Sequence, residues 1–240
     1  MHRIGGALLV TDPEKVPDLT YIYPNYYHTF AQPEFVFYKK PLYDAEKRVM
    51  DIILSLTAIA VLFPVMVIIA ASIMIDDFGN PIFIQKRVGK NGKEFWMLKF
   101  RSMYKGAEIK RTELLRLNQA DGPIFKIKND PRVTAVGKFI RRTSLDELPQ
   151  LFNILQGSMS IIGPRPFVTY EQKKMNTYQS QRLLVKPGLS CYWQIRGRSD
   201  VNFRDLIELD LKYIQNRGIL LDIGLIMKTV IVVFTTSGAY

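Results

Sequence analysis

The longest apolar stretch of the chain lies in its first third. Residues 52–75 contain no charged side chain. About 20 consecutive apolar residues suffice to cross the hydrocarbon core of a bilayer, so this run predicts a membrane helix. A core helix of this length would normally keep a polar face, which this run lacks. We therefore expect the chain to contact a membrane.

Pro64 lies in the middle of this run, where its missing N–H removes one helical hydrogen bond and favours a kink. The hydroxyls of Ser55 and Thr57 are candidates to satisfy the freed carbonyl. Basic residues flank the run on both sides: Lys39, Lys40, Lys47 and Arg48 precede it, and Lys86, Arg87, Lys90 and Lys93 follow it. Basic flanks are typical of the cytoplasmic side. Two topologies stay open: a helix that bends at Pro64 and returns to the same face, and a single span that tolerates the kink.

Shorter elements follow the apolar run. Expected strands cover residues 82–84, 94–103, 124–128, 159–162 and 192–195, with a turn at 186–190, and expected helices cover 105–117, 133–142, 167–184, 203–216 and 219–234. Asp222 and Lys228 interrupt the last helix, so we expect it to be interfacial or packed instead of a second span. The pattern predicts an α/β fold, mostly α with a few short strands.

The strand over 94–103 alternates with period two. This alternation is expected to place Trp96, Leu98 and Phe100 on one side. Lys99 and Arg101 then share the other side, where they are candidates to bind phosphate. A solvated strand face explains the two cations equally well at this point.

Two adjacent carboxylates, Asp146 and Glu147, begin a segment with an apolar helical stripe that ends at Gly157. Ser144 and Glu147 have the spacing of a capping box, whereas Pro149 favours a cap at Asp146. Either cap puts both carboxylates at the helix N-terminus, where the dipole keeps an aspartate ionised. An ionised carboxylate can attack phosphorus or bind a divalent metal. A helix cap without a catalytic role is the alternative.

Arginines flank these carboxylates in the sequence. Arg165 lies between two prolines in the segment 163–166, and Arg141 and Arg142 precede the acids. Stiff backbone around Arg165 suits a guanidinium that binds phosphate bidentately. Adjacent acids flanked by arginines predict metal-assisted phosphoryl transfer.

Composition narrows the class of protein. The chain has 240 residues, 48% of them hydrophobic, which suits one globular domain with an anchor. The formal net charge of +11 favours an anionic partner: nucleic acid, lipid headgroups or a phosphorylated substrate. Cys191 is the single cysteine, so no internal disulfide is expected, and we expect it to be buried. The early apolar run over 7–10 is too short for a signal peptide.

Several motifs occur in one order from about residue 47 to residue 240. They are the Pro-broken apolar segment, Gln85-Lys86-Arg87-Val88-Gly89, Lys99-Phe100-Arg101-Ser102-Met103, Asp130-Pro131-Arg132-Val133-Thr134, Ser144-Leu145-Asp146-Glu147-Leu148-Pro149-Gln150, Gly163-Pro164-Arg165-Pro166, Lys186-Pro187-Gly188-Leu189 and Gly197-Arg198. This set resembles the bacterial sugar transferases called monotopic phosphoglycosyl transferases, the undecaprenyl-phosphate hexose-1-phosphate transferases of exopolysaccharide, capsule and glycan assembly.

The resemblance implies a re-entrant membrane helix over 45–78, broken at Pro64, and a cytosolic catalytic domain over 79–240 at the cytoplasmic face of the cell membrane. It implies that Asp146 attacks the β-phosphate of a UDP-sugar, that UMP leaves, and that polyprenyl phosphate then takes the phosphosugar. Glu147 completes the catalytic pair, and Mg²⁺ is held by Asp146, Glu147 or both. Arg141 and Arg165 occupy positions of phosphate-binding arginines. Membrane lipids are expected partners, and a second copy of the chain, as a homo-oligomer, is a further candidate partner.

Two parts of the chain depart from this family. Cys191 and Tyr192 follow the Lys-Pro-Gly-Leu turn where many members have glycine-rich residues, so no uridine contacts are assigned there. Residues 1–44 lie outside the resemblance and are rich in aromatic residues and proline, which fits packing against lipid or docking of a partner.

Three rival hypotheses remain. A membrane-tethered binding protein would use its basic face without depending on Asp146. Nucleic-acid binding is disfavoured because no recognisable module is present. A catalytically dead scaffold is disfavoured by the intact Asp146, Glu147 and Arg165. The sugar is expected to be glucose or galactose, and an N-acetylated sugar stays open.

Overall fold

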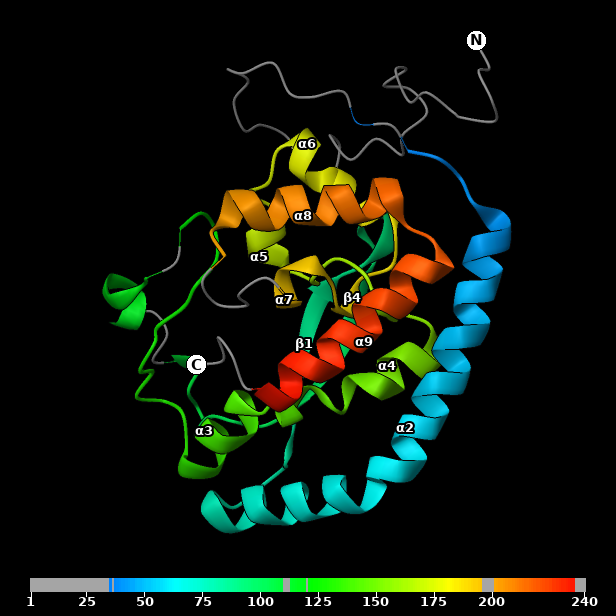
Figure 1. The fold of residues 1–240 in the computed structure, drawn as a ribbon. Coiled ribbons are helices and arrows are strands. Elements are labelled where there is room, and N and C mark those ends of the chain that lie inside the picture. The colour runs from blue at the N-terminus through cyan, green and yellow to red at the C-terminus, as the bar shows by residue number, and fades with distance from the viewer. Residues whose placement is uncertain (1–34, 36, 110–112, 120, 196–200, 236–240) are drawn as a thin grey trace.

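A computed structural model describes residues 35, 37–109, 113–119, 121–195 and 201–235 of the chain. This part is mostly helical with a few short strands, as the sequence predicts (Figure 1). Most of the predicted N-terminal extension over 1–44 lies outside the described residues. The division into an extension, a membrane helix and a catalytic domain stays a prediction.

The elements follow one another in a simple order. The α-helices and strands are α2 (Pro41–Asp76), β1 (Ile82–Val88), β2 (Glu94–Phe100), α3 (Ala135–Arg142), α4 (Gln150–Gln156), β3 (Ser160–Ile162), α5 (Thr169–Gln172), α6 (Thr177–Ser180), β4 (Gly188–Ser190), α7 (Tyr192–Ile195), α8 (Phe203–Asn216) and α9 (Ile219–Thr235). The 3₁₀ helices are η1 (Lys90–Gly92), η3 (Glu113–Leu117), η4 (Leu145–Glu147) and η5 (Gln181–Leu184). β1 and β2 form an antiparallel hairpin with Asn91 at positive φ in its turn, and β3 pairs with β4 in parallel.

The helix α2 is long and apolar enough to cross a membrane by length and composition, and it is the one such helix in the described part of the chain. It runs down one side of the molecule and then bends sharply to continue beneath it (Figure 1). Pro64 lies inside this helix, so the predicted kink is confirmed. The hydroxyls of Ser55 and Thr57 donate to Ile52 and Ile53, hence not to the carbonyl four residues before Pro64.

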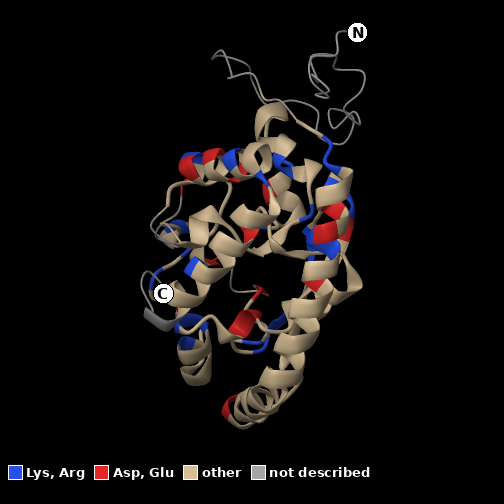
Figure 2. Ribbon diagram, turned by 45° about the vertical axis from the view of Figure 1, so that its right-hand side comes forward, with Lys and Arg blue, Asp and Glu red and all other residues tan. Residues whose placement is uncertain are grey.

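Both ends of α2 are attached to the rest of the molecule. In its first turns, Lys47 pairs with Asp222 of α9 at 2.6 Å, and Arg48 donates to two carbonyl oxygens at the end of α4. At the other end, Asp76 accepts a hydrogen bond from the backbone N–H of Val136 at 3.0 Å. Figure 2 shows charged residues near both ends of α2 and a long uncharged stretch between them. The apolar side chains of that stretch are mostly exposed.

The core consists of three apolar clusters. The largest joins α7, α8 and α9 around Ile162 of β3. A second packs the last part of α2 against Phe100 and Ile140, and a third packs Met97 against α4 and Met159. Since Met97 and Phe100 are buried in different clusters, both faces of the hairpin are covered. For this reason the expected apolar side of β2 is only partly correct: Phe100 is buried, but Trp96 is 59% exposed.

Several predicted elements differ from the structure. Residues 167–184 form α5, α6 and η5 instead of one helix, because Asn176 accepts from the N–H of Gln179 and caps a new helix there. Over 105–117 the described residues form turns and 3₁₀ helix, such as η3, instead of an α-helix, and no strand forms over 124–128. Residues 192–195 form the helix α7, since a short apolar run does not distinguish strand from helix.

The remaining helices are confirmed. α3 ends at Arg142, α8 spans the predicted residues 203–216, and α9 covers 219–235 with a buried Asp222. The predicted turn at 186–190 contains the strand β4. This strand pairs with β3, which is distant in the sequence, so the local pattern did not reveal it. Cys191 is buried, as expected.

Candidate active site

Asp146 and Glu147 lie in the 3₁₀ turn η4, directly before α4. Neither predicted cap forms: Ser144 has a positive φ of 58° and makes no side-chain cap, and α4 begins only after Pro149. Pro149 has no N–H to bond the carbonyl four residues earlier, so the turn before it closes through tighter bonds such as Leu148 N–H to Leu145 O. The two acids thus occupy their own turn instead of the first turn of α4.

Lys99 of β2 reaches this acid pair. Its ammonium lies 2.8 Å from Oε1 of Glu147 and 3.8 Å from Oδ2 of Asp146. Arg101, the other cation proposed for this strand, instead pairs with Asp77 at the end of α2, 3.6 Å from its carboxylate. The structure therefore brings Lys99, but not Arg101, into contact with the two acids.

The pKa values of the two neighbouring carboxyls are shifted in opposite directions. Burial raises the pKa of Asp146, and the neighbouring Glu147 adds to this rise, while Lys99 counteracts both. Burial acts in the same sense on Glu147, but Lys99 and Arg165 outweigh it and lower the pKa of Glu147. Glu147 therefore holds its negative charge more firmly than Asp146.

Arg165 lines the same cleft as Glu147. Its guanidinium packs over the ring of Trp193 with its central carbon 4.9 Å from the ring centroid. Residues of six elements and of the loop after β3 line this cleft together: Arg87, Met97, Lys99, Glu147, Gln150, Arg165, Pro166, Gly188, Leu189 and Trp193. Arg141, at the end of α3, is close enough to Asp146 for its charge to lower the pKa of that carboxyl. Both predicted phosphate-binding arginines thus act on the acid pair.

Two arginines to which the sequence analysis gave no role in the site, the half-buried Arg87 and the buried Arg182, hold the backbone around Arg165. Arg87 donates to the carbonyl of Pro166 at 3.0 Å, and Arg182 donates to the carbonyl of Arg165. Arg182 is also paired with the buried Asp210 of α8. The backbone around Arg165 is therefore held both by its flanking prolines and by tertiary hydrogen bonds. Pairs between residues so far apart in sequence leave no local pattern to find.

Gln194 is a further residue that the sequence analysis did not identify. Its Nε2 lies 3.5 Å from Oε2 of Glu147, opposite the oxygen that Lys99 binds. It lies on α7, which was predicted as a strand without a functional role. A glutamine within a short aromatic segment was the one signal in the sequence, and only the structure shows that it is buried.

The acid pair also fits a magnesium ion. Within the described residues, no cluster of three or more His, Cys, Asp and Glu side chains occurs. Mg²⁺ commonly uses one or two carboxylates and completes its shell with substrate phosphates and water. Asp146 and Glu147 supply that donor set, beside the cations of the cleft.

Comparison with known proteins places the chain in a family. The family model described as bacterial sugar transferase matches residues 42–236. The galactosyl transferase CpsE of Streptococcus agalactiae is 43% identical over 194 residues, which cover 80% of this chain and 43% of the relative. The undecaprenyl-phosphate galactose phosphotransferase of Salmonella typhimurium is 42% identical over 202 residues, covering 81% and 41%.

A third relative has nearly the length of this chain. The exopolysaccharide production protein ExoY of Rhizobium meliloti is 35% identical over 215 residues, which cover 88% of this chain and 95% of the relative. The chain thus spans about two fifths of the first two relatives and almost all of ExoY. The names of other relatives specify different sugars, glucose in one and N-acetylgalactosamine in another. With its motifs in order and the family model covering most of its length, this chain belongs to the bacterial sugar transferase family.

Proposed function

We propose that this protein transfers a sugar-1-phosphate from a UDP-sugar to undecaprenyl phosphate at the cytoplasmic face of a bacterial membrane, as a membrane step of exopolysaccharide or capsule assembly. The observation that carries the proposal is a cleft lined by Lys99, Arg165 and Glu147, with Asp146 next to Glu147 and 3.8 Å from the ammonium of Lys99. Family membership and the names of the relatives support the substrates.

The reaction has two displacement steps at phosphorus. In the first, a carboxylate oxygen of Asp146 bonds to the β-phosphorus of the UDP-sugar, and the bond from that phosphorus to the bridging oxygen breaks, so UMP leaves with that oxygen. In the second, a phosphate oxygen of undecaprenyl phosphate bonds to the same phosphorus. The bond to Asp146 breaks, which restores the carboxylate and yields the diphosphate-linked sugar.

The neighbours of Asp146 have separate roles in this scheme. Glu147 stays ionised beside Lys99 and Gln194, and its charge keeps the Asp146 carboxylate basic and therefore nucleophilic. Arg165 binds phosphate oxygens of the donor, with its guanidinium already held over Trp193. Asp146 and Glu147 would hold Mg²⁺, which when bound neutralises charge on the diphosphate.

We further propose that α2 is re-entrant, so that both of its ends lie on the cytoplasmic side. If straight, the uncharged run over 52–75 would be about 36 Å long, enough to cross the roughly 30 Å of a hydrocarbon core. The bend at Pro64 instead lets both ends of α2 contact the same globular body, through Lys47 at one end and Asp76 at the other.

The sugar is proposed to be a hexose, with glucose or galactose ahead of an N-acetylated sugar. The decisive experiment measures UMP release by the protein in nanodiscs with Mg²⁺, undecaprenyl phosphate and a panel of UDP-sugars. We expect release from one sugar, and loss of release in Asp146→Asn. Asp205→Asn, at an exposed position on α8, serves as the matched control and should keep the activity.

Two other outcomes would contradict parts of this proposal. Folded, membrane-bound protein that releases no UMP from any donor would contradict the transfer reaction and favour a tethered binding role. Full activity in Asp146→Asn would exclude Asp146 as the nucleophile.

A further inference from the structure

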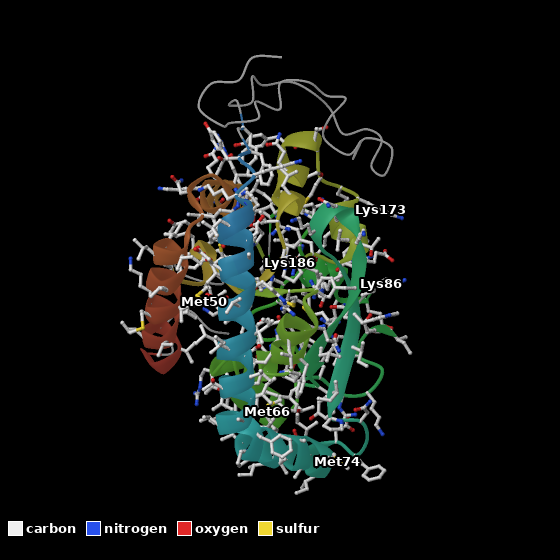
Figure 3. All side chains as sticks on the ribbon, turned by 90° about the vertical axis from the view of Figure 1, so that its right-hand side faces the viewer. Met50, Met66, Met74, Lys86, Lys173 and Lys186 are labelled. Atoms are coloured by element: carbon white, nitrogen blue, oxygen red, sulfur yellow. The ribbon has the colours of Figure 1, made fainter. Side chains whose placement is uncertain are left out.

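A second groove lies between the first turns of α2 and the segment that leads into β4. It encloses about 440 Å³ of space, including its open mouth, and shares no lining residue with the cleft of the acid pair. Five cations line it: Lys47, Arg48, Lys90, Lys186 and Arg217. Figure 3 shows Lys186 beside the upper part of α2. The groove is thus a basic site that the proposed transfer reaction does not use.

The positive charge of this groove is poorly compensated. Asp44 and Asp51 are the acids among its lining residues. Lys47 alone of the five cations has a carboxylate within ion-pair distance among the described residues, namely Asp222. The side chains of Lys90 and Lys186 make no hydrogen bond or ion pair within the described part of the chain.

The two arginines are bound only to neutral oxygens. Arg48 donates to the carbonyls of Ile154 and Leu155, each at 2.7 Å. Arg217 donates to the carbonyl of Ile214 at 2.6 Å and to that of Tyr38. Carbonyl oxygens fix these guanidinium groups in place, and no carboxylate of the described residues lies within ion-pair distance of either. Asp44 and Asp222 act on Arg217 only from farther away.

Lys186 shows the electrostatic consequence. It is half-buried, and burial lowers its pKa, as does the charge of the neighbouring Arg48. An anion in the groove would offset this effect, because its negative charge stabilises the charged ammonium. The ligand that fits is a group bearing phosphate oxygens, for which lysine and arginine are the usual partners.

The position of the groove along α2 identifies the source of the phosphate. Lys47 and Arg48 precede the uncharged run that starts at Ile52 by four to five residues, about 6 to 8 Å along the helix axis. Where α2 enters a bilayer, this level is that of the lipid headgroups. Basic pockets beside membrane helices on the cytoplasmic side bind anionic headgroups.

We propose that this groove binds the phosphate of an anionic membrane phospholipid. The site holds the first turns of α2 at the depth of the headgroups. It rests on the proposed membrane insertion of α2 and is independent of the transfer reaction.

The test titrates delipidated full-length protein in detergent with phosphatidylglycerol and counts bound lipid by native mass spectrometry. The test variant is Lys90→Gln with Lys186→Gln. The matched control is Lys173→Gln with Lys174→Gln, which removes two exposed charges away from the groove (Figure 3). Each cation near an anionic headgroup contributes about a fivefold factor, so we expect binding about 25-fold weaker in the test variant and unchanged binding in the control.

A charge-preserving variant separates misfolding from loss of the site. Lys90→Arg with Lys186→Arg should bind like the wild type. Equal affinity in the wild type and the Gln variant would overturn the proposal, as would an equal loss in the control, which indicates unspecific attraction.

Competition distinguishes the sources of phosphate. Displacement of phosphatidylglycerol by millimolar inorganic phosphate at constant ionic strength would assign the groove to a soluble ligand and overturn the lipid proposal. A loss of undecaprenyl phosphate binding without a loss of phosphatidylglycerol binding would assign it to the carrier instead. UMP release is scored separately: protein that binds the lipid but releases no UMP keeps this site and loses only the proposed reaction.

Discussion

At the scale of single residues, the site depends on how charge is shared between two neighbouring acids. Lys99 sits closer to Glu147 than to Asp146, and Gln194 approaches the other oxygen of Glu147. Glu147 therefore keeps the charge, and Asp146 stays the more basic of the two. Arg165 is a fixed cation of the same cleft, because its side chain lies on Trp193 and the backbone around it is held by two other arginines.

This arrangement predicts that the shape of Arg165 matters as well as its charge. Arg165→Lys keeps the charge but loses the planar fork, so kcat/KM for UMP release should fall about 10- to 100-fold, the equivalent of one charge-assisted hydrogen bond. Steady-state kinetics of UMP release measure the effect. Arg204→Lys, on the exposed face of α8, is the control and should match the wild type. Unchanged kinetics in Arg165→Lys would remove Arg165 from phosphate binding.

At the scale of elements, α2 and the β3–β4 pair place the site. α2 packs its last part against α3 and β2, whose ends carry Arg141 and Lys99. The parallel pairing of β3 and β4 brings the segment after Ile162 next to Gly188, and both line or border the cleft. The ends of these elements thus supply the residues in and around the cleft.

The bent helix predicts a topology that cysteine labelling can read. In a Cys191→Ser background, Lys39→Cys and Asn80→Cys place single thiols at exposed positions before and after α2. We expect a membrane-impermeant maleimide to label both from the cytoplasmic side in inverted vesicles and neither in intact spheroplasts. Labelling of the two positions from opposite sides would show that α2 crosses the bilayer.

The β3–β4 pair predicts a strong effect of one methyl group. A Cβ at Gly188 would lie 2.0 Å from the backbone N of Gly163, so Gly188→Ala should destabilise the protein by about 3 kcal/mol and lower Tm by about 6 to 12 °C. Gly224→Ala on α9, where a Cβ meets nothing within 4 Å, should instead leave Tm unchanged or raise it slightly. Thermal unfolding in detergent compares the two variants. Equal Tm values would show that the strands are not packed this closely.

At the scale of the whole molecule, Asp222 joins three helices. It is fully buried, and it accepts hydrogen bonds from Tyr43 of α2 and Tyr213 of α8, each at 2.9 Å. It also pairs with Lys47 of α2. This single carboxylate therefore connects the start of the membrane helix to α8 and α9, and an apolar helix such as α9 retains it for that reason.

Loss of the Asp222 charge should weaken this connection. Asp222→Asn leaves Lys47 unpaired in a mostly buried place, which costs about 3 to 5 kcal/mol and lowers Tm by about 6 to 20 °C. Asp205→Asn, an exposed change on the neighbouring α8, should shift Tm by no more than about 2 °C. Differential scanning fluorimetry measures the Tm of both variants. A small effect at Asp222 would mean that apolar packing alone positions α2.

Features with a local physical cause were predictable from the sequence. The uncharged run 52–75 and Pro64 predict a long, kinked helix. Both causes are local: the transfer of apolar side chains from water to lipid favours the helix, and the missing N–H of Pro64 removes one backbone hydrogen bond. The period of 203–216 predicts α8 to the residue, and the adjacency of Asp146 and Glu147 is itself a property of the sequence. The cytosolic placement and the metal stay predictions.

Only the tertiary structure decided which groups meet. β4 forms because β3 lies beside it, and Lys99 reaches Glu147 across 48 residues of sequence while Arg101 turns to Asp77. The pKa order of the acid pair follows from these meetings, because burial and Coulomb energies depend on distances in space. The sequence pattern contains no such distances. It therefore identified the two acids as candidates, whereas their pKa order depends on the tertiary structure.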